Sequence, residues 1–318
     1  MSQRLILALG ATLSARWGMQ CELRDITQAY VQSTDKIQRT LLAKPPKELQ
    51  DTFPKDTILR IVRPLYGAAE SGLYWFKTYH SHHQYALRMK TSTYDPCLLI
   101  TDEGQSPFGI TGMQTDDTLS FVTSDFSTRE ESELKKANFR AKDKTILSHD
   151  QPLEFNGGKI TLYEDNITLT QKGQISKVCT INPDADDAAQ QYVAQRARGA
   201  YIASVCQPEA VFDLSTAAQT TQPSIEDINA LNVRLQWQMD NPARGLTFIP
   251  LDLDRAKLFI FTDGSFANNK DLSSQLGFVI VLANENRTNL NFRIKGNIIH
   301  WNSVKCKRVT RSVLASEL

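Results

Sequence analysis

The sequence predicts an α+β fold, with strands and helices in separate stretches of the chain. A hairpin is expected over 108–123, because two β-prone segments, Phe108–Met113 and Leu119–Val122, flank a short polar stretch. A largely helical tract follows at 188–239, and strand-like segments separated by polar turns then occupy 257–301. Runs of strands followed by runs of helices are typical of α+β proteins.

The composition is that of an ordinary globular protein. The chain has 318 residues, of which 41% are hydrophobic and 22% charged, enough for about two or three domains. The formal net charge is +1, so any affinity for nucleic acid must come from local basic patches. The five cysteines are widely spaced and include no Cys-x-x-Cys pair, which indicates neither a disulfide framework nor a zinc module.

The N-terminal segment imitates a secretory signal, because Arg4 precedes a short apolar run. The helical spacing of Leu5, Leu9 and Leu13 favours a core-facing helix instead. No segment approaches the length of a membrane span. We therefore expect an intracellular protein, cytoplasmic or nuclear, that is not secreted and has no membrane partner.

A strand is expected over 19–26, and Asp25 at its end could also cap a helix. A second strand, 57–62, runs into Leu65-Tyr66-Gly67, where the glycine permits a tight turn.

A long helix over 68–89 is expected next, with Leu73, Phe76 and Tyr79 on one stripe and Trp75 beside it. Three histidines, His80, His82 and His83, lie near its middle. They have no cysteine or acidic partner at ligand spacing, so a solvated helical face is favoured over a metal site.

Beyond the hairpin, Ser127 and Glu130 predict a capping box that opens a solvent-facing helix through Lys136. A second small hairpin, 159–170, follows Phe155-Asn156-Gly157-Gly158. Two helices are then expected, Ala188–Cys206 and one starting at Ser224. The apolar face of the second helix comprises Ile225, Ile228, Leu231, Leu235 and Met239. The last region is predicted to form strands at Lys257–Phe261, Leu276–Leu282 and Ile298–Trp301, with a helix beginning near Ser312.

The tip of the first hairpin carries two adjacent carboxylates, Asp116 and Asp117. Adjacent like charges repel, and nothing basic within the hairpin neutralises them, so a divalent cation is a natural counter-ion. A solvated turn is the alternative, because turns favour aspartate on their own account. For an isolated Asp-Asp pair the solvated turn would be preferred.

Taken together, Asp25 with Tyr30, Leu65-Tyr66-Gly67, Asp116-Asp117 and Phe155-Asn156-Gly157 resemble reverse transcriptases of the Ty1/copia retrotransposon class in order and spacing. The resemblance implies a palm-like antiparallel sheet in which three residues hold Mg²⁺, or Mn²⁺ in its place, for nucleotide addition. The implied catalytic and metal-binding residues are Asp25, Asp116 and Asp117. The implied partners are an RNA template, a DNA primer and deoxynucleoside triphosphates.

The resemblance also assigns substrate contacts. It places Tyr30 beneath the incoming sugar, where the ring leaves no room for a 2′-hydroxyl, and puts Tyr66 and Gly67 in the nucleotide pocket. Gly157 and Gly158 would belong to the element that grips the primer end, where glycine allows close backbone approach.

The C-terminal region resembles the ribonuclease H domain that follows the polymerase in this class. Thr262-Asp263-Gly264-Ser265 matches the first catalytic Asp, and Ala315-Ser316-Glu317-Leu318 the catalytic Glu. The expected domains are therefore a palm and partial thumb (1–183), a helical connection (184–255) and a truncated ribonuclease H-like α/β domain (256–318). Because Asp263 and Glu317 make only half of an acidic site, ribonuclease H activity is predicted to be absent.

Three departures from the family pattern bear on activity. Gln114-Thr115 precedes the Asp pair where the family has Tyr-Val, the upstream fingers segment is missing, and the remaining ribonuclease H carboxylates do not appear. The expected function is that of an RNA-directed DNA polymerase fragment. The alternative is a catalytically silent, nucleic-acid-binding relic that uses basic groups such as Lys305, Lys307, Arg308 and Arg311.

Overall fold

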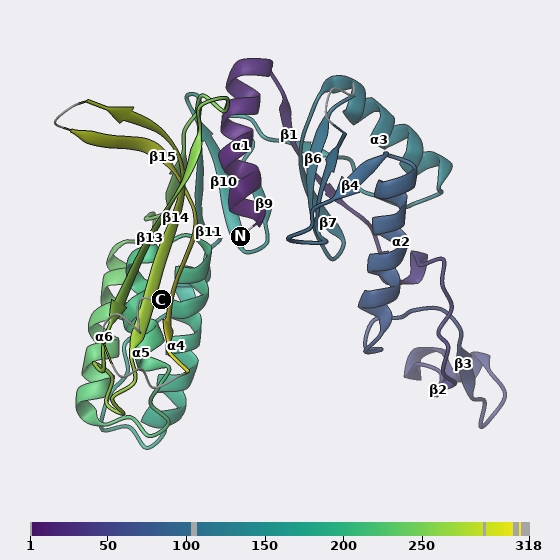
Figure 1. The fold of residues 1–318 in the computed structure, drawn as a ribbon. Coiled ribbons are helices and arrows are strands. Elements are labelled where there is room, and N and C mark those ends of the chain that lie inside the picture. The colour runs from purple at the N-terminus through teal and green to yellow at the C-terminus, as the bar shows by residue number, and fades with distance from the viewer. Residues whose placement is uncertain (1, 103–106, 289–290, 308–311, 313–318) are drawn as a thin grey trace. The chain divides into compact units, whose positions relative to one another are not determined.

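The computed structural model describes residues 2–102, 107–288, 291–307 and 312 (Figure 1). The chain divides into two compact units. Met19–Ile146 forms the first, here called the central unit. Gln3–Gly18 and the described residues from Leu147 onward form the second, here called the split unit. This division by packing differs from the three domains expected from the sequence, whose boundaries stay a prediction.

The central unit is built on one antiparallel sheet with the strand order β4-β5-β6-β7-β1-β8 (Figure 1). Its strands are β1 (Gln20–Asp25), β4 (Met89–Thr91), β5 (Leu98–Thr101), β6 (Gly109–Gln114), β7 (Asp117–Val122) and β8 (Thr145–Ile146). The expected hairpin is confirmed as β6–β7. Because β1 pairs with β7, a strand at the start of this unit lies beside one formed about a hundred residues later.

Two helices pack on this sheet, α2 (Ser71–Tyr85) and α3 (Ser124–Lys136). Short elements complete the unit: η1 (Ala29–Gln32), β2 (Leu41–Ala43), η2 (Lys47–Thr52) and β3 (Leu59–Ile61), with β2 and β3 paired. The core gathers Trp75 and Tyr79 from α2 against Phe126 and Leu134 of α3 and sheet residues such as Leu99. Helix and sheet therefore share one continuous apolar core.

The predicted buried stripe of the α2 helix is wrong in part. Leu73 is 54% exposed, whereas Trp75 and Tyr79 are almost fully buried. The expectation of a solvated histidine face is also wrong for His83, which is buried, with Nδ1 2.9 Å from the carbonyl oxygen of Tyr79. Tyr79 and His83 lie one turn apart on the face that meets the sheet.

The capping box predicted at Ser127 and Glu130 is also wrong. Helix α3 begins earlier, and Thr123 caps it by accepting a hydrogen bond from the backbone N–H of Phe126. The hydroxyl of Ser127 donates instead to Glu22, and Glu130 accepts from Arg24. Polar residues of α3 thus form hydrogen bonds with side chains of β1, so this helix is not exposed to solvent on all sides.

The split unit begins with α1 (Ser2–Trp17), which confirms the expected N-terminal helix. Leu13 is buried as expected, but Leu5 and Leu9 are only half-buried. A four-stranded sheet with the order β12-β11-β10-β9 follows. Its strands are β9 (Leu153–Phe155), β10 (Gly158–Tyr163), β11 (Asn166–Gln171) and β12 (Leu246–Phe248). The predicted second hairpin is confirmed as β10–β11.

The helical part of the split unit contains α4 (Ala188–Val205), α5 (Val211–Ala217) and α6 (Ile225–Asp240), with the short turns η3 (Gln174–Lys177) and η4 (Pro208–Ala210). Helices α4 and α6 confirm the sequence prediction, whereas α5 was not foreseen. Ser224 caps α6 in a capping box with Asp227. Ile228, Leu231 and Leu235 are buried, but Ile225 is 55% exposed.

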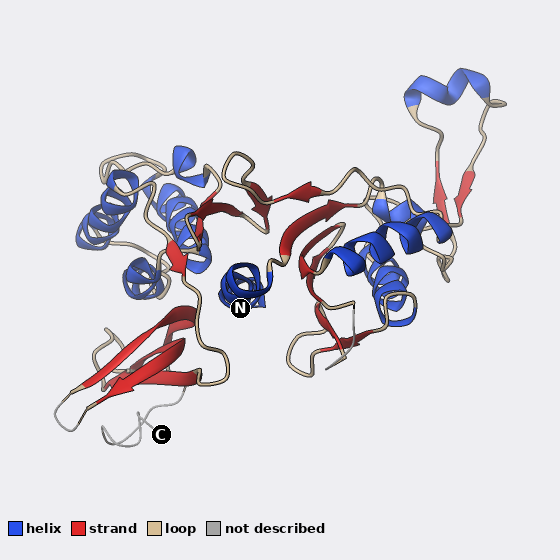
Figure 2. Ribbon diagram, turned by 90° about the horizontal axis from the view of Figure 1, so that it is seen from above, coloured by secondary structure: helices blue, strands red, loops and turns tan. Residues whose placement is uncertain are grey.

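A three-stranded antiparallel sheet with the order β13-β14-β15 completes the split unit (Figure 2). Its strands are β13 (Lys257–Ser265), β14 (Gln275–Arg287) and β15 (Phe292–Lys305), each longer than predicted. Of the helix expected near Ser312, the structure describes only Ser312 itself. The mixed helices and antiparallel sheets confirm the α+β class.

Candidate functional site: a carboxylate pair at the end of a sheet

The β6–β7 turn places the two adjacent aspartates at the end of the sheet. Gln114 pairs with Asp117, so Thr115 and Asp116 alone make the connection. Thr115 adopts φ 55°, a left-handed conformation that a tight two-residue connection requires and that is uncommon for a β-branched residue. The conformation of the turn therefore fixes the backbone positions of Asp116, in the turn, and Asp117, at the start of β7.

Strand β1 brings the third predicted aspartate to the same place. Asp25 lies directly opposite Asp117 in the antiparallel register, and residues opposite each other carry their side chains on the same face. The backbone N–H of Ile26 donates to the carbonyl of Asp116 at 2.9 Å. All three aspartates are half-buried. The structure thus brings Asp25 beside the Asp pair, as the sequence predicted.

A lysine that the sequence analysis missed completes this end of the sheet. The ammonium group of Lys142 forms an ion pair with the carboxylate of Asp25, and its backbone N–H donates to the Asp25 carbonyl at 2.9 Å. The hydrogen bond that Lys142 donates to the Asp25 carboxylate raises the pKa of Lys142, and the charges of Asp117 and Asp116 raise it further. No local spacing signals this contact, because Lys142 is 117 residues from Asp25.

Helix α2 contacts the β6–β7 turn through Trp75. The indole N–H of Trp75 donates to the carbonyl of Thr115 at 2.7 Å, and the ring is 1% exposed. This hydrogen bond satisfies a turn carbonyl and ties the turn to the core. Trp75 is the second residue at this site that the sequence analysis did not assign.

Two tyrosines stack close to the aspartates. The rings of Tyr30 and Tyr66 have centroids 4.5 Å apart at an interplanar angle of 27°. Burial raises the pKa of Tyr66, and the electrostatic effects of Asp116 and Tyr30 raise it further. Hydrogen bonds with the backbone of Ala29 and Tyr30 lower it in part. Of the predicted nucleotide-pocket residues, Tyr66 thus senses the charge of Asp116, and Tyr30 stacks on Tyr66.

Glycines shape the surroundings of this tyrosine pair. Gly67 adopts φ 95°, so the predicted tight turn after Tyr66 needs a residue without a Cβ. A Cβ added at Gly72, in the first turn of α2, would lie 3.7 Å from the Tyr30 hydroxyl, an ordinary contact. The turn at Gly67 presents Tyr66, which is 53% exposed, to the Tyr30 ring.

A buried ionic cluster supports the same strand. Arg24, next to Asp25, is almost buried and bonds both carboxylate oxygens of Glu130, one from Nη2 at 2.7 Å. Lys144 contacts Glu22 and Glu130, each at 3.3 Å. Burial works to lower the pKa of Arg24, but the hydrogen bonds and charges of Glu130 and Glu131 raise it overall. These paired charges fix β1 against α3.

The three aspartates supply the oxygen ligands that Mg²⁺ and Mn²⁺ prefer. Carboxylates of this kind are suitable ligands for such an ion. In the structure, the Lys142 ammonium group occupies a position beside the Asp25 carboxylate. Within residues 2–102, 107–288, 291–307 and 312, however, no three His, Cys, Asp or Glu side chains are arranged to hold a metal ion. A metal at this site therefore stays a prediction.

The remaining predicted site residues lie in the split unit. Gly157, with φ 79°, lies in the turn between β9 and β10, and Gly158 is the first residue of β10, opposite Phe155. A Cβ at Gly157 would meet the Tyr201 hydroxyl at 2.0 Å, and one at Gly158 would meet Leu169 at 2.4 Å. Asp263 is exposed near the end of β13, and Glu317 lies outside the described residues. Packing thus accounts for both glycines, and their role at a primer end stays a prediction.

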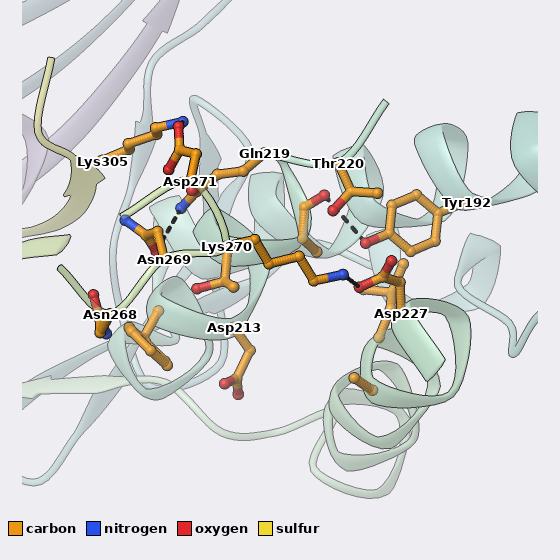
Figure 3. Close-up of a pocket in the computed structure, with 15 residues that line it drawn as sticks. Tyr192, Asp213, Gln219, Thr220, Asp227, Asn268, Asn269, Lys270, Asp271 and Lys305 are labelled. Atoms are coloured by element: carbon orange, nitrogen blue, oxygen red, sulfur yellow. Dashed lines mark hydrogen bonds and ion pairs between the residues drawn. The ribbon is translucent and has the colours of Figure 1, made fainter. Parts of the chain in front are cut away.

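A separate pocket of about 300 Å³ lies in the split unit, between the α4–α6 helices and the loop before β14 (Figure 3). Its charged groups are already paired: Lys270 contacts Asp227 at 2.7 Å, and Lys305 contacts Asp271. Gln219 donates to Asn269 at 3.4 Å, and the Tyr192 hydroxyl to the Ala217 carbonyl at 3.1 Å. These contacts join the loop to the helices, so the pocket is explained by packing between the two.

Among the described helices, none has the length and apolar character needed to cross a membrane.

No protein-family model matches the sequence, and no curated protein matches it. Solved structures do share its fold. A foamy viral protease-reverse transcriptase in complex with an RNA/DNA hybrid aligns with 94% of this chain at a TM-score of 0.52 and 11% identity. A foamy viral protease-reverse transcriptase in complex with double-stranded DNA aligns with 93% at a TM-score of 0.50 and 12% identity. The chain spans 35% and 53% of those chains.

At such low identity the likeness shows the fold alone. The chain has an α+β fold similar to that of reverse transcriptases with a ribonuclease H-like part.

Proposed function

We propose that this chain is an RNA-directed DNA polymerase fragment of a Ty1/copia-type retrotransposon. It would extend a DNA primer on an RNA template by adding deoxynucleoside triphosphates. The observation that carries the proposal is the position of Asp25 directly opposite Asp117, with Asp116 adjacent. This pair lies at the end of an antiparallel sheet in a fold similar to that of reverse transcriptases.

Asp25, Asp116 and Asp117 would hold Mg²⁺ or Mn²⁺ in this function. When bound, a pair of such ions activates the primer hydroxyl and stabilises the leaving pyrophosphate. The chain's own residues prepare the site: the β1–β7 register sets two carboxylates side by side, and Trp75 anchors the turn that carries Asp116. Lys142 neutralises Asp25 in the structure and would have to release it to a metal ion.

Primer extension on an RNA template, with purified chain and Mg²⁺, tests the proposal. We expect Asp25→Asn and Asp117→Asn each to lower the extension rate by at least about a hundredfold, because each removes a charged oxygen ligand. Asp51→Asn is the matched control, since Asp51 is exposed on η2 of the same unit and should retain full activity. Extension that survives both site substitutions would contradict the proposal.

A second function is favoured by two observations at the same site. Lys142 already pairs with Asp25, and no metal-binding group of three is formed among the described side chains. A catalytically silent relic that binds a hybrid duplex would show both features. Of its proposed basic contacts, Lys307 is exposed and Lys305 is paired with Asp271, while Arg308 and Arg311 lie outside the described residues.

Salt-dependent binding of an RNA–DNA hybrid without primer extension, in Mg²⁺ and in Mn²⁺, is the result expected for the relic. Metal-dependent extension that is lost in Asp25→Asn would decide for the polymerase.

A further inference from the structure

The side chain of Gln32 is inserted into the hydrogen-bond ladder that continues beyond β1. There Ile26 forms an antiparallel bridge with Ala141, and the backbone N–H of Thr27 donates to the carbonyl of Arg140 at 2.9 Å. In a regular ladder the N–H of Arg140 would donate back to the carbonyl of Thr27. Instead, that N–H donates to Gln32 Oε1 at 2.7 Å, and Gln32 Nε2 donates to the Thr27 carbonyl at 2.6 Å. The side-chain amide therefore lies between two backbone groups that would otherwise bond directly.

The same amide closes the short loop that contains Tyr30. Gln28 adopts φ 51°, so the chain leaves the ladder directly after Thr27 and enters η1. Gln32 is the last residue of η1, and its amide returns to Thr27, so Tyr30 lies between the two ends of a closed loop. Gln32 Nε2 also donates to the Arg140 carbonyl at 3.0 Å, which joins the loop to the neighbouring segment.

Other contacts hold the middle of this loop. Ala29 is fully buried in the core of the central unit, and the Tyr66 hydroxyl forms hydrogen bonds with the backbone of Ala29 and Tyr30. The Tyr30 ring stacks on Tyr66. Because these contacts do not depend on Gln32, loss of its amide should loosen the ends of the loop without unfolding it.

We propose that Gln32 is a positioning residue for sugar selection, whose amide sets the place of the Tyr30 ring relative to Asp25. Gln32 acts through Tyr30: it ties the loop that carries the ring to Thr27, and the ladder ties Thr27 to the end of β1. The proposal rests on the proposed polymerase function and on the role that this function gives to Tyr30.

Gln32→Met tests the proposal in primer extension, because methionine keeps the length of the side chain and removes its three hydrogen bonds. We expect the ratio of ribo- to deoxynucleotide incorporation to rise by at least about fivefold, the order expected for the loss of one net hydrogen bond. A ratio equal to that of the unsubstituted chain would overturn the proposal.

Gln50→Met is the matched control. Gln50 is exposed on η2 of the same unit, and its Nε2 donates at 3.2 Å to the carbonyl of Pro45, five residues earlier, as Gln32 Nε2 donates to Thr27. The control therefore removes a hydrogen bond of the same kind from another loop and should leave the ratio unchanged.

Gln32→Glu separates the two ends of the amide. Its carboxylate can still accept from the N–H of Arg140, but it cannot donate to the carbonyl of Thr27. We expect the ratio to rise at least as much as in Gln32→Met. A normal ratio in Gln32→Glu would overturn the proposal, because the donation to Thr27 is the bond that closes the loop.

A double-mutant cycle tests whether Gln32 acts through the Tyr30 ring. In Tyr30→Val the ring is absent, so the further change Gln32→Met should alter the ratio by less than about twofold. An effect on general stability would instead be the same in both backgrounds. Equal effects of Gln32→Met with and without the ring would overturn the proposal.

Hydrogen exchange tests the closed loop without any need for activity. Amides of residues 27–32 should exchange faster in Gln32→Met than in the unsubstituted chain, and those of Gln50→Met should exchange normally in this loop. Unchanged exchange in Gln32→Met would overturn the proposal. Circular dichroism of each variant checks that the chain remains folded.

Failure of this proposal is distinguishable from failure of the proposed function. An unsubstituted chain that extends primers, with normal discrimination in Gln32→Met, overturns the role of Gln32 alone. An unsubstituted chain that extends no primer overturns the polymerase function, and the role of Gln32 in sugar selection with it.

Discussion

Tyr30 stacks on Tyr66, whose pKa the charge of Asp116 helps to raise. On the proposed function, replacing Tyr30 by valine should admit ribonucleotides, because removal of the ring opens space for a 2′-hydroxyl. The measurement is the ratio of ribo- to deoxynucleotide incorporation in primer extension, which we expect to rise by at least about tenfold. Tyr94→Val, at a tyrosine 62% exposed in the same unit, is the control. An unchanged ratio in Tyr30→Val would remove Tyr30 from this role.

Burial of His83 predicts a loss of stability in acid. Burial lowers the pKa of His83 to about 4, although the hydrogen bond to Tyr79 opposes the shift. Between pH 6.5 and 4 the unfolded chain therefore binds a proton that the folded chain does not, so the free energy of unfolding falls as the pH falls through this window. For His83 the loss is on the order of 3 kcal/mol.

Urea unfolding between pH 4 and 7 measures this effect. In His83→Gln the fall in the free energy of unfolding across the window should be smaller than in the unsubstituted chain. His149→Gln, at an exposed histidine, is the control for loss of an imidazole. Equal pH slopes for His83→Gln and the unsubstituted chain would show that His83 titrates normally in the folded state.

The β9–β10 turn provides a prediction at the level of an element. Gly157→Ala adds a Cβ both at a positive φ and against Tyr201, whereas Gly173→Ala adds one at φ 90° in open space. We expect Gly173→Ala to cost about 1 kcal/mol and Gly157→Ala about 2 kcal/mol of unfolding free energy. Chemical denaturation measures both.

The double variant Gly157→Ala/Tyr201→Ala separates the two causes. Removing the Tyr201 ring should bring the cost of Gly157→Ala down to that of Gly173→Ala, because only the backbone strain remains. No recovery would mean that the close approach of Tyr201 does not govern this turn.

The elements that the sequence predicted are those with local signals. Alternation and turn residues found β6–β7 and β10–β11, and the apolar face that follows Ser224 found α6. The buried face of α2 was misjudged because the sheet that it packs against decides which side is covered, not the spacing of Leu73 alone.

The residues of the candidate site fall into two groups, those assigned from the sequence and those that only the structure shows. Asp25, Asp116 and Asp117 were assigned through the resemblance, because their placement at a strand end and a turn alone left other interpretations open, and the β1–β7 register brings Asp25 opposite Asp117. Lys142 and Trp75 could not be found, because each reaches the site through a contact between residues 117 and 40 positions apart. Only the folded chain brings such pairs together.

For the whole molecule, the resemblance predicts no ribonuclease H activity. Two carboxylates cannot readily position both ions that this chemistry needs, and Asp263 is exposed on a strand edge. Purified chain incubated with a labelled RNA–DNA hybrid in Mg²⁺ or Mn²⁺ should leave the RNA intact. Hybrid-specific cleavage that disappears in Asp263→Asn would show this prediction wrong.

The attachment of α1 to the split unit governs the order in which the protein can mature on the ribosome. Arg4 donates to the carbonyl of Ile299 at 3.0 Å, and Thr12 accepts from the backbone of Leu251 at 2.8 Å. Helix α1 thus depends on partners that are synthesised up to nearly three hundred residues later. The central unit, Met19–Ile146, is one uninterrupted stretch and can fold meanwhile. Until residues 251–299 are synthesised, α1 lacks these partners and is a natural substrate for chaperones.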